Sequence, residues 1–235
     1  MPNNKKKSAF MSAYLLPSFK YIPFLPTDDH PSEDERSHLS PASQLKYFAQ
    51  KHLNPSTSSK DNMQFYNEGQ AVGDVLVFIC GHRGRDVRCG ILGPVLRDEF
   101  RTVLASSGIG VEEPGEASSP DHDTYYRRNY VSTPQVGERL EKNEEDSIGN
   151  PGSLARVGLI SHIGGHKFAG NVIVYLPTEM KMGGQAHPLA GCGIWYGRVE
   201  PKHVEGIVKE TILGGQVIKD MFRGGIREGG EIIRI

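Results

Sequence analysis

The chain has few cysteines, no excess of charge and no long apolar run. It holds 3 Cys among 235 residues, too few for a disulfide framework and typical of a compartment that keeps thiols reduced. Lys+Arg 27 against Asp+Glu 28 gives a net charge of -1, without the basic surplus of a nucleic-acid-binding protein. No apolar stretch approaches the roughly 20 residues that span a bilayer. We therefore expect neither a nucleic-acid partner nor a membrane span.

The sequence is also less apolar than a compact globule of this size, with 37% hydrophobic residues and a mean hydropathy of -0.42. Residues 1–71 account for much of this, and we expect an irregular N-terminal arm or linker there, with one short helix over 43–53. The prolines of its apolar segment, SAYLLPSFKYIPFLP, exclude a long helix. Its first 27 residues lack acid, arginine and a clear apolar core, so they predict neither a secretory signal nor a transit peptide.

Residues 72–235 read as one compact domain. Four apolar, β-branched runs predict strands, namely 74–80, 155–162, 171–177 and 193–200. A first helix is expected to begin just after Cys89 because Pro94 is tolerated only near a helix start. It places one apolar stripe toward the core, made of Ile91, Leu92, Val95, Leu96, Phe100, Val103 and Leu104.

A second helix is expected after Pro201 and should end at Gly214-Gly215. The tail to Ile235 ends in EIIRI, which fits a short edge strand or a docked arm. Residues 111–152 are acidic and poor in apolar side chains, which predicts an exposed insertion. The fold class that follows is α/β (α+β): a small mixed sheet of thioredoxin-like type, flanked by helices, behind an irregular N-terminal arm.

Two short pairs of metal-ligating residues carry the chemistry. Cys80 and Cys89 lie in CGHRGRDVRC, and His162 and His166 lie in HIGGH. Each pair follows a predicted strand, so we expect all four side chains at one end of the sheet. Two thiolates and two imidazoles suit a 2Fe–2S cluster or zinc. A gap of eight residues between the cysteines exceeds the two to four that are usual in zinc fingers, which favours the two-iron cluster. Cys192 is a further candidate thiol, although a buried, inert cysteine is the more common case.

The segments VFICGHRGRDVRCGILGPVL, SHIGGHKFAGNVIVYLP and GIWYGRVEP resemble the sucrase/ferredoxin-like family, the thioredoxin-like 2Fe–2S ferredoxins of fungi. The resemblance covers residues 72 to about 215. It implies that Cys80 and Cys89 bind one iron of the cluster, and that His162 and His166 bind the other. It also implies a mitochondrial location, with a cytoplasmic one as the alternative, although the presequence usual in the family is not found in this chain.

The expected function is a 2Fe–2S electron-transfer protein in mitochondrial redox or thiol quality control, more an electron carrier than a stand-alone enzyme. Because the sequence shows no flavin or nicotinamide motif, a separate reductase and an electron acceptor are expected. Their identity and the oligomeric state do not follow from the sequence. Two alternatives stay open: a structural zinc-binding interaction module, and a thioredoxin-like thiol oxidoreductase, which the absence of a C-x-x-C motif disfavours.

Overall fold

The structure is a computed structural model, and it describes residues 10–26, 70–82, 84, 86–112 and 152–235. The chain forms two compact units, residues 1–72 and residues 73–235. The expected helix over 43–53 lies outside the described residues. So does most of the expected insertion, since its first two residues are described in a strand and its last in a turn.

The first unit contains a β-hairpin. Strand β1 (Phe10–Leu15) pairs antiparallel with β2 (Lys20–Pro26), and the short β3 (Gln70–Ala71) pairs with β2. The rings of Tyr14 and Tyr21 are direct partners across the hairpin, with centroids 4.9 Å apart. Prolines had excluded a long helix here, and the described residues 10–26 are indeed extended. The strand pairing was not predicted, because the alternation of apolar residues is interrupted at the turn.

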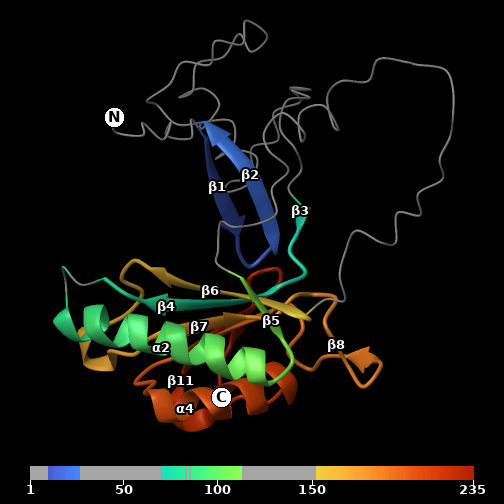
Figure 1. The fold of residues 1–235 in the computed structure, drawn as a ribbon. Helices are drawn as coiled ribbons and strands as arrows, with labels where there is room; N and C mark the ends of the chain where they lie inside the picture. The colour runs from blue at the N-terminus through green and yellow to red at the C-terminus, as the bar shows by residue number, and fades with distance from the viewer. Residues whose placement is uncertain (1–9, 27–69, 83, 85, 113–151) are drawn as a thin grey trace, which may run out of the picture. The chain divides into compact units, whose positions relative to one another are not determined.

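The second unit is built on a seven-stranded mixed sheet (Figure 1). Its strand order is β12-β11-β10-β7-β4-β6-β5. The bounds of the strands are β4 Val75–Cys80, β5 Gly110–Glu112, β6 Leu154–Ile160, β7 Val172–Tyr175, β10 Cys192–Tyr196, β11 Phe222–Arg227 and β12 Ile232–Ile233. A separate two-stranded hairpin consists of β8 (Lys181–Met182) and β9 (Gln185–Ala186).

The centre of the sheet sets the direction of the site. Strands β4 and β6 run parallel, with Cys80 opposite Ile160, and β7 runs antiparallel on the other side of β4. Five of the six β4 residues are buried, which explains its continuous apolar run. Since parallel strands end at the same edge of a sheet, the loops after β4 and β6 leave the sheet side by side.

Helix α2 (Val87–Ser106) connects β4 to β5 and begins before Cys89, not after it. Asp86 explains the earlier start: its carboxylate accepts the backbone N–H of Arg88 at 2.8 Å, which is a helix N-cap. The predicted apolar stripe is right for Leu96, Phe100 and Leu104, which are fully buried, but Ile91 and Val95 are exposed.

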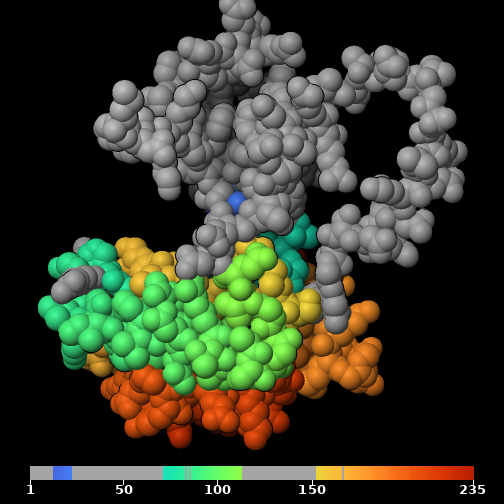
Figure 2. All heavy atoms as spheres, in the orientation of Figure 1, coloured from blue at the N-terminus to red at the C-terminus, as the bar shows by residue number. Residues whose placement is uncertain are grey.

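The second predicted helix is confirmed. It consists of α4 (Pro201–Gly206), which continues as the π-helical segment η3 (Ile207–Leu213) and ends at Gly214. Helices α2 and α4 contact each other and lie on the same side of the sheet (Figure 1). In the space-filling view, α2 and the C-terminal residues form one continuous surface on that side (Figure 2). The main apolar core lies between these helices and the sheet.

The predicted fold class is confirmed: the second unit is an α+β domain with a mixed sheet and helices packed on it. The sheet is larger than expected because β5, β11 and β12 join the four predicted strands. Strand β12 occupies one edge, as the end of the sequence suggested. No helix in the described ranges is long and apolar enough to cross a membrane.

Candidate thiol site

The candidate site lies where β4 and β6 end and β7 begins. The backbone N–H of Cys80 bonds to the Asn171 carbonyl at 3.0 Å, and the N–H of Gly81 bonds to the Ile160 carbonyl at 3.0 Å. These bonds hold the ends of three strands together at the point where the cysteine and histidine loops leave the sheet. The expectation that the cysteine pair and the loop that begins at His162 share one end of the sheet is confirmed.

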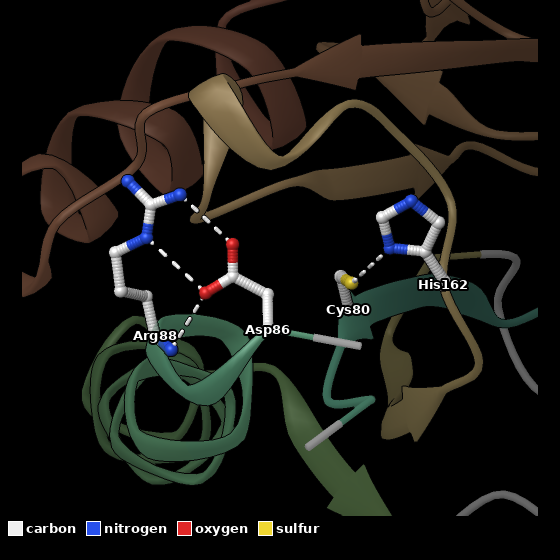
Figure 3. Close-up of polar contacts among 4 residues, drawn as sticks. All are labelled: Cys80, Asp86, Arg88 and His162. Carbon is white, nitrogen blue, oxygen red and sulfur yellow. Dashed lines mark hydrogen bonds and ion pairs between the residues drawn. The ribbon is translucent and has the colours of Figure 1, made fainter. Parts of the chain in front are cut away.

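Cys80 and His162 meet across the two parallel strands (Figure 3). The Cys80 sulfur lies 4.0 Å from Nδ1 of His162, at the long end for a hydrogen bond to sulfur. Cys80 is 1% exposed, whereas His162 is half-buried. An imidazole in this position is suited to exchange a proton with the thiol.

Cys89 completes a pair of thiols. It lies in the first turn of α2, is 1% exposed, and is near enough to Cys80 for that thiol to influence its ionisation. Burial raises the pKa of Cys89 to about 11, and the neighbouring Cys80 acts in the same direction, while the Gly170 backbone opposes both. At neutral pH the Cys89 thiol therefore keeps its proton and can donate it toward the Cys80 sulfur.

Two glycines let the backbone approach the sulfurs. A Cβ on Gly93 would lie 2.9 Å from the Cys80 carbonyl oxygen, so α2 could not pack this close to the end of β4 with a larger residue. Gly170 has φ +88, and a Cβ there would lie 2.3 Å from the Val199 carbonyl oxygen. This conformation directs the Gly170 N–H at the Cys89 sulfur.

Asn171 was missed by the sequence-based reasoning. It is 1% exposed, and a Cβ on Gly164 would lie 2.7 Å from its Oδ1. Its side chain thus fills the space that the glycine leaves in the HIGGH loop, and its backbone carbonyl holds Cys80. The position of Asn171, directly after Gly170 and before β7, could have indicated this role. A single Asn in a loop carries no such signal alone.

His166 opens the short 3-10 helix η2 (His166–Phe168), and its side chain lies outside the described residues. Cys192 is fully buried in β10, where it faces the Arg227 side chain, and burial raises its pKa. Because Tyr196, at the other end of β10, is the residue paired with Val172, Cys192 lies away from the Cys80 end of the sheet. This placement agrees with the interpretation of Cys192 as a buried, inert thiol.

The predicted function of a 2Fe–2S electron carrier must be corrected. The described residues contain no group of three or more His, Cys, Asp or Glu side chains that could hold a metal ion. A metal site needs three or more donors converging on one point to replace the hydration of the ion, whereas the described contact here is that of the Cys80 sulfur with the His162 imidazole, with a second thiol, Cys89, nearby. The same finding speaks against the structural zinc alternative. The assignment of Cys80, Cys89, His162 and His166 as cofactor ligands is a separate question and stays a prediction.

Known proteins show where the chain belongs. It is 31% identical over 229 residues to "Altered inheritance of mitochondria protein 32" of Debaryomyces hansenii, covering 94% of this chain and 62% of that protein. A protein of the same name from Meyerozyma guilliermondii is 35% identical over 157 residues, 67% of this chain and 36% of the relative. "Actin patches distal protein 1" of Saccharomyces cerevisiae is 30% identical over 137 residues, 58% of this chain and 29% of that protein.

The chain thus spans between 29% and 62% of the length of these relatives. No solved structure matches it. The cysteine and histidine motifs of the sequence resemble those of one family, and the model of that family matches residues 1–224. The chain belongs to the sucrase/ferredoxin-like family.

Proposed function

We propose that the chain carries out thiol redox chemistry at Cys80 and Cys89, with His162 as the proton acceptor. The observation that supports this proposal is the imidazole nitrogen of His162, 4.0 Å from the Cys80 sulfur, with a second buried thiol, Cys89, near enough to Cys80 for its pKa to be affected. Two buried thiols at one end of a sheet are candidates for a disulfide, which forms when their Cα atoms lie within about 7 Å of each other. Because the fold brings Cys80 and Cys89 to one end of the sheet, the lack of a C-x-x-C motif, which would bring two cysteines together by local spacing alone, does not exclude this chemistry.

The reaction balances with a low-molecular-weight disulfide as the oxidant. His162 takes the proton of Cys80, and the resulting thiolate attacks the oxidant, forming a mixed disulfide and releasing one thiol. Cys89 then gives up its proton and attacks the Cys80 sulfur, which releases the second thiol and closes the Cys80–Cys89 disulfide. Two protein thiols are oxidised, and one disulfide is reduced to two thiols.

Burial shapes this chemistry. Both sulfurs are 1% exposed, so exchange with a large protein disulfide requires the loops around the site to open. The raised pKa of Cys89 makes it a poor nucleophile at neutral pH. Attack therefore begins at Cys80, and Cys89 acts second.

A mitochondrial setting is part of the proposal. The relatives that share the sequence are named for altered inheritance of mitochondria, and we place the thiol chemistry of this chain in a mitochondrial context on that ground. The partner is a thiol or disulfide of that compartment.

A cofactor at the same residues is a separate proposal. Cys80 lies beside His162, Cys89 is a neighbouring thiol, and the Gly170 backbone acts to lower the pKa of Cys89, which favours an ionised sulfur. With His166 as the fourth ligand, a 2Fe–2S cluster is the group expected from the sequence, and zinc is the alternative. Such a group would hold both thiols in the ionised state.

One preparation tests both proposals. The full chain is purified without oxygen, and its iron, zinc and acid-labile sulfide are measured. The metal-free fraction is then treated with oxidised glutathione and analysed by mass spectrometry. The thiol proposal predicts a loss of two hydrogens and a linked peptide joining residues 80 and 89. A variant with His162→Ala should form this link more slowly at pH 7 and regain speed at pH 9.

The matched control is Cys192→Ser, which should form the same linked peptide as the unmodified chain. Cys80→Ser and Cys89→Ser should each abolish it. A disulfide that involves Cys192, or none at all, contradicts the thiol proposal. About two irons and two sulfides per chain would replace it with the cofactor proposal.

A further inference from the structure

Three cations surround one aromatic ring next to the thiol site. Lys167, Arg198 and Arg223 place their charged groups 4.9, 5.1 and 3.1 Å from the centroid of the Phe168 ring. All three side chains are exposed. Since each charge lies near the same ring, the three are within about 10 Å of one another, close to one Debye length in physiological salt. The ring attracts each cation and so partly offsets their mutual repulsion.

These cations form no ion pair with an acidic residue in the described parts of the chain. Glu200, two residues after Arg198, pairs with Lys202 at 2.7 Å instead. The chain as a whole carries a net charge of -1, so this cluster is a local concentration of positive charge that an anionic surface would neutralise.

The backbone holds the cluster in place at some cost. Arg198 has φ 60, a left-handed conformation that is unfavourable for a residue with a Cβ. Its N–H bonds to the Phe168 carbonyl at 3.4 Å, and the N–H of Val199 bonds to the Gly170 carbonyl at 3.1 Å. These two hydrogen bonds join the segment of Arg198 and Val199 to the segment of Phe168 and Gly170. The cluster is therefore connected to Gly170, whose backbone influences the pKa of Cys89.

We propose that Lys167, Arg198 and Arg223, arranged around Phe168, form a docking surface for a protein partner with a carboxylate-rich face. The favoured occupant is a protein and not a small anion, because small ligands are held in concave pockets, whereas these side chains stand exposed around a ring. Complementary charge on an open surface steers a protein partner and fixes its orientation. The proposal goes beyond the thiol chemistry and does not depend on it.

The test measures binding of a fluorescein-labelled decaglutamate peptide to the full chain by fluorescence anisotropy. We expect saturable binding at 20 mM salt that weakens at 200 mM, and a loss of affinity of about tenfold or more in Arg198→Glu/Arg223→Glu. The matched control is Lys181→Glu/Lys209→Glu, which makes the same charge change at two exposed lysines outside the cluster. The control should bind within about twofold of the unmodified chain, and circular dichroism establishes that both variants are folded.

Equal weakening in the two double variants would overturn the proposal, because net charge alone would then explain binding. Displacement of the peptide by inorganic phosphate at the same concentration of charge would also overturn it, as would tighter binding to phosphatidylserine vesicles that the cluster variant abolishes. A Cys80→Ser/Cys89→Ser chain should bind the peptide unchanged. Failure of the docking proposal and failure of the thiol proposal are therefore separate results.

Discussion

At the residue scale, the site depends on which of two neighbouring sulfurs keeps its proton. The pKa of Cys89 is raised from 9.0 to about 11, first by burial and then by the neighbouring Cys80 thiol. A thiol whose folded-state pKa lies above its unfolded value contributes stability that is complete below pH 9 and is lost as the pH rises toward 11. We predict a fall of about 1–2 kcal/mol in the free energy of unfolding across this range.

Urea unfolding at pH 8, 9, 10 and 11 measures this fall. Cys89→Ser removes the titrating group and should flatten the dependence, whereas Cys80→Ser should leave Cys89 with a pKa closer to its ordinary value because the neighbouring thiol is gone. An alkaline profile of the Cys89→Ser chain that matches the original would contradict the assignment.

A second prediction at this scale concerns Gly170. Replacement by Ala puts a Cβ 2.3 Å from the Val199 carbonyl oxygen at a residue with φ +88, and the segment must move. We expect a loss of about 2–4 kcal/mol in stability and faster alkylation of Cys89 by iodoacetamide, since the Gly170 N–H no longer holds the sulfur.

Gly184→Ala is the matched control for Gly170→Ala. Gly184 has φ +83 in the β8–β9 hairpin, and a Cβ there meets nothing within 4 Å. Gly184→Ala should lower the free energy of unfolding by about 1 kcal/mol, because only the left-handed backbone conformation is then unfavourable. It should not change the reactivity of Cys89. Similar losses in both variants would mean that the close contact with Val199 contributes nothing.

At the element scale, α2 connects helix stability with the chemistry of its first turn. Asp86 caps the helix through the Arg88 N–H and also binds the Arg88 side chain at 2.8 Å (Figure 3). Asp86→Ala should therefore cost about 1 kcal/mol. It should also lower the pKa of Cys89, because the Asp86 carboxylate is one of the causes that raise it.

Asp98→Ala provides the comparison, measured by urea unfolding and by the pH dependence of Cys89 alkylation. Asp98 lies on the same helix and pairs with Arg97 at 2.8 Å on an exposed surface, but it caps nothing. Its replacement should change stability by less than about 0.5 kcal/mol and leave the Cys89 titration in place. If Asp86→Ala and Asp98→Ala have the same effect on stability and on the titration of Cys89, the helix cap at Asp86 does not control either quantity.

The sequence predicted elements best where one signal was strong. The continuous apolar run of β4 and the Pro201 to Gly214 helix both appear as expected. The start of α2 was placed too late, because the prediction rested on Pro94 and did not consider Asp86 as a cap. Strands β5 and β11 were missed because three residues of β5 and the glycines of β11 carry little β signal; their place in the sheet is decided by neighbours far along the chain.

At the scale of the whole molecule, the topology explains how much of the site was predictable. The parallel pairing of β4 with β6 brings the Cys80 loop and the His162 loop to one edge, and this followed from two strands with a helical crossover. That Cys80 and Cys89 share one end of the sheet was expected from the sequence, but how closely their thiols approach each other was not. It depends on how closely α2 packs against the end of β4. Gly93 permits this close packing because a side chain there would collide with the backbone of Cys80 and Gly81.

The last prediction concerns the acid stability of the whole domain. His187 is 3% exposed, and its Nδ1 accepts the Leu189 N–H at 3.2 Å. Burial lowers the pKa of His187, and the neighbouring Ile212 backbone acts in the opposite direction. The unfolded chain therefore binds a proton at this residue more readily than the folded domain does. The stability that the neutral ring contributes is complete above about pH 6.5 and is lost as the pH falls toward the folded-state pKa.

We expect His187 to add up to about 1.4 kcal/mol per pH unit to the loss of stability below pH 6.5, measured by urea unfolding at pH 7.5, 6.5 and 5.5. His187→Gln should be less stable at pH 7.5 but show a shallower decline with acid. His203→Gln is the control, since His203 lies at the start of α4 and is only partly buried; it should keep the steep decline. A decline that is equally steep in the His187 variant would show that other groups, and not protonation of His187, govern the loss of stability in acid.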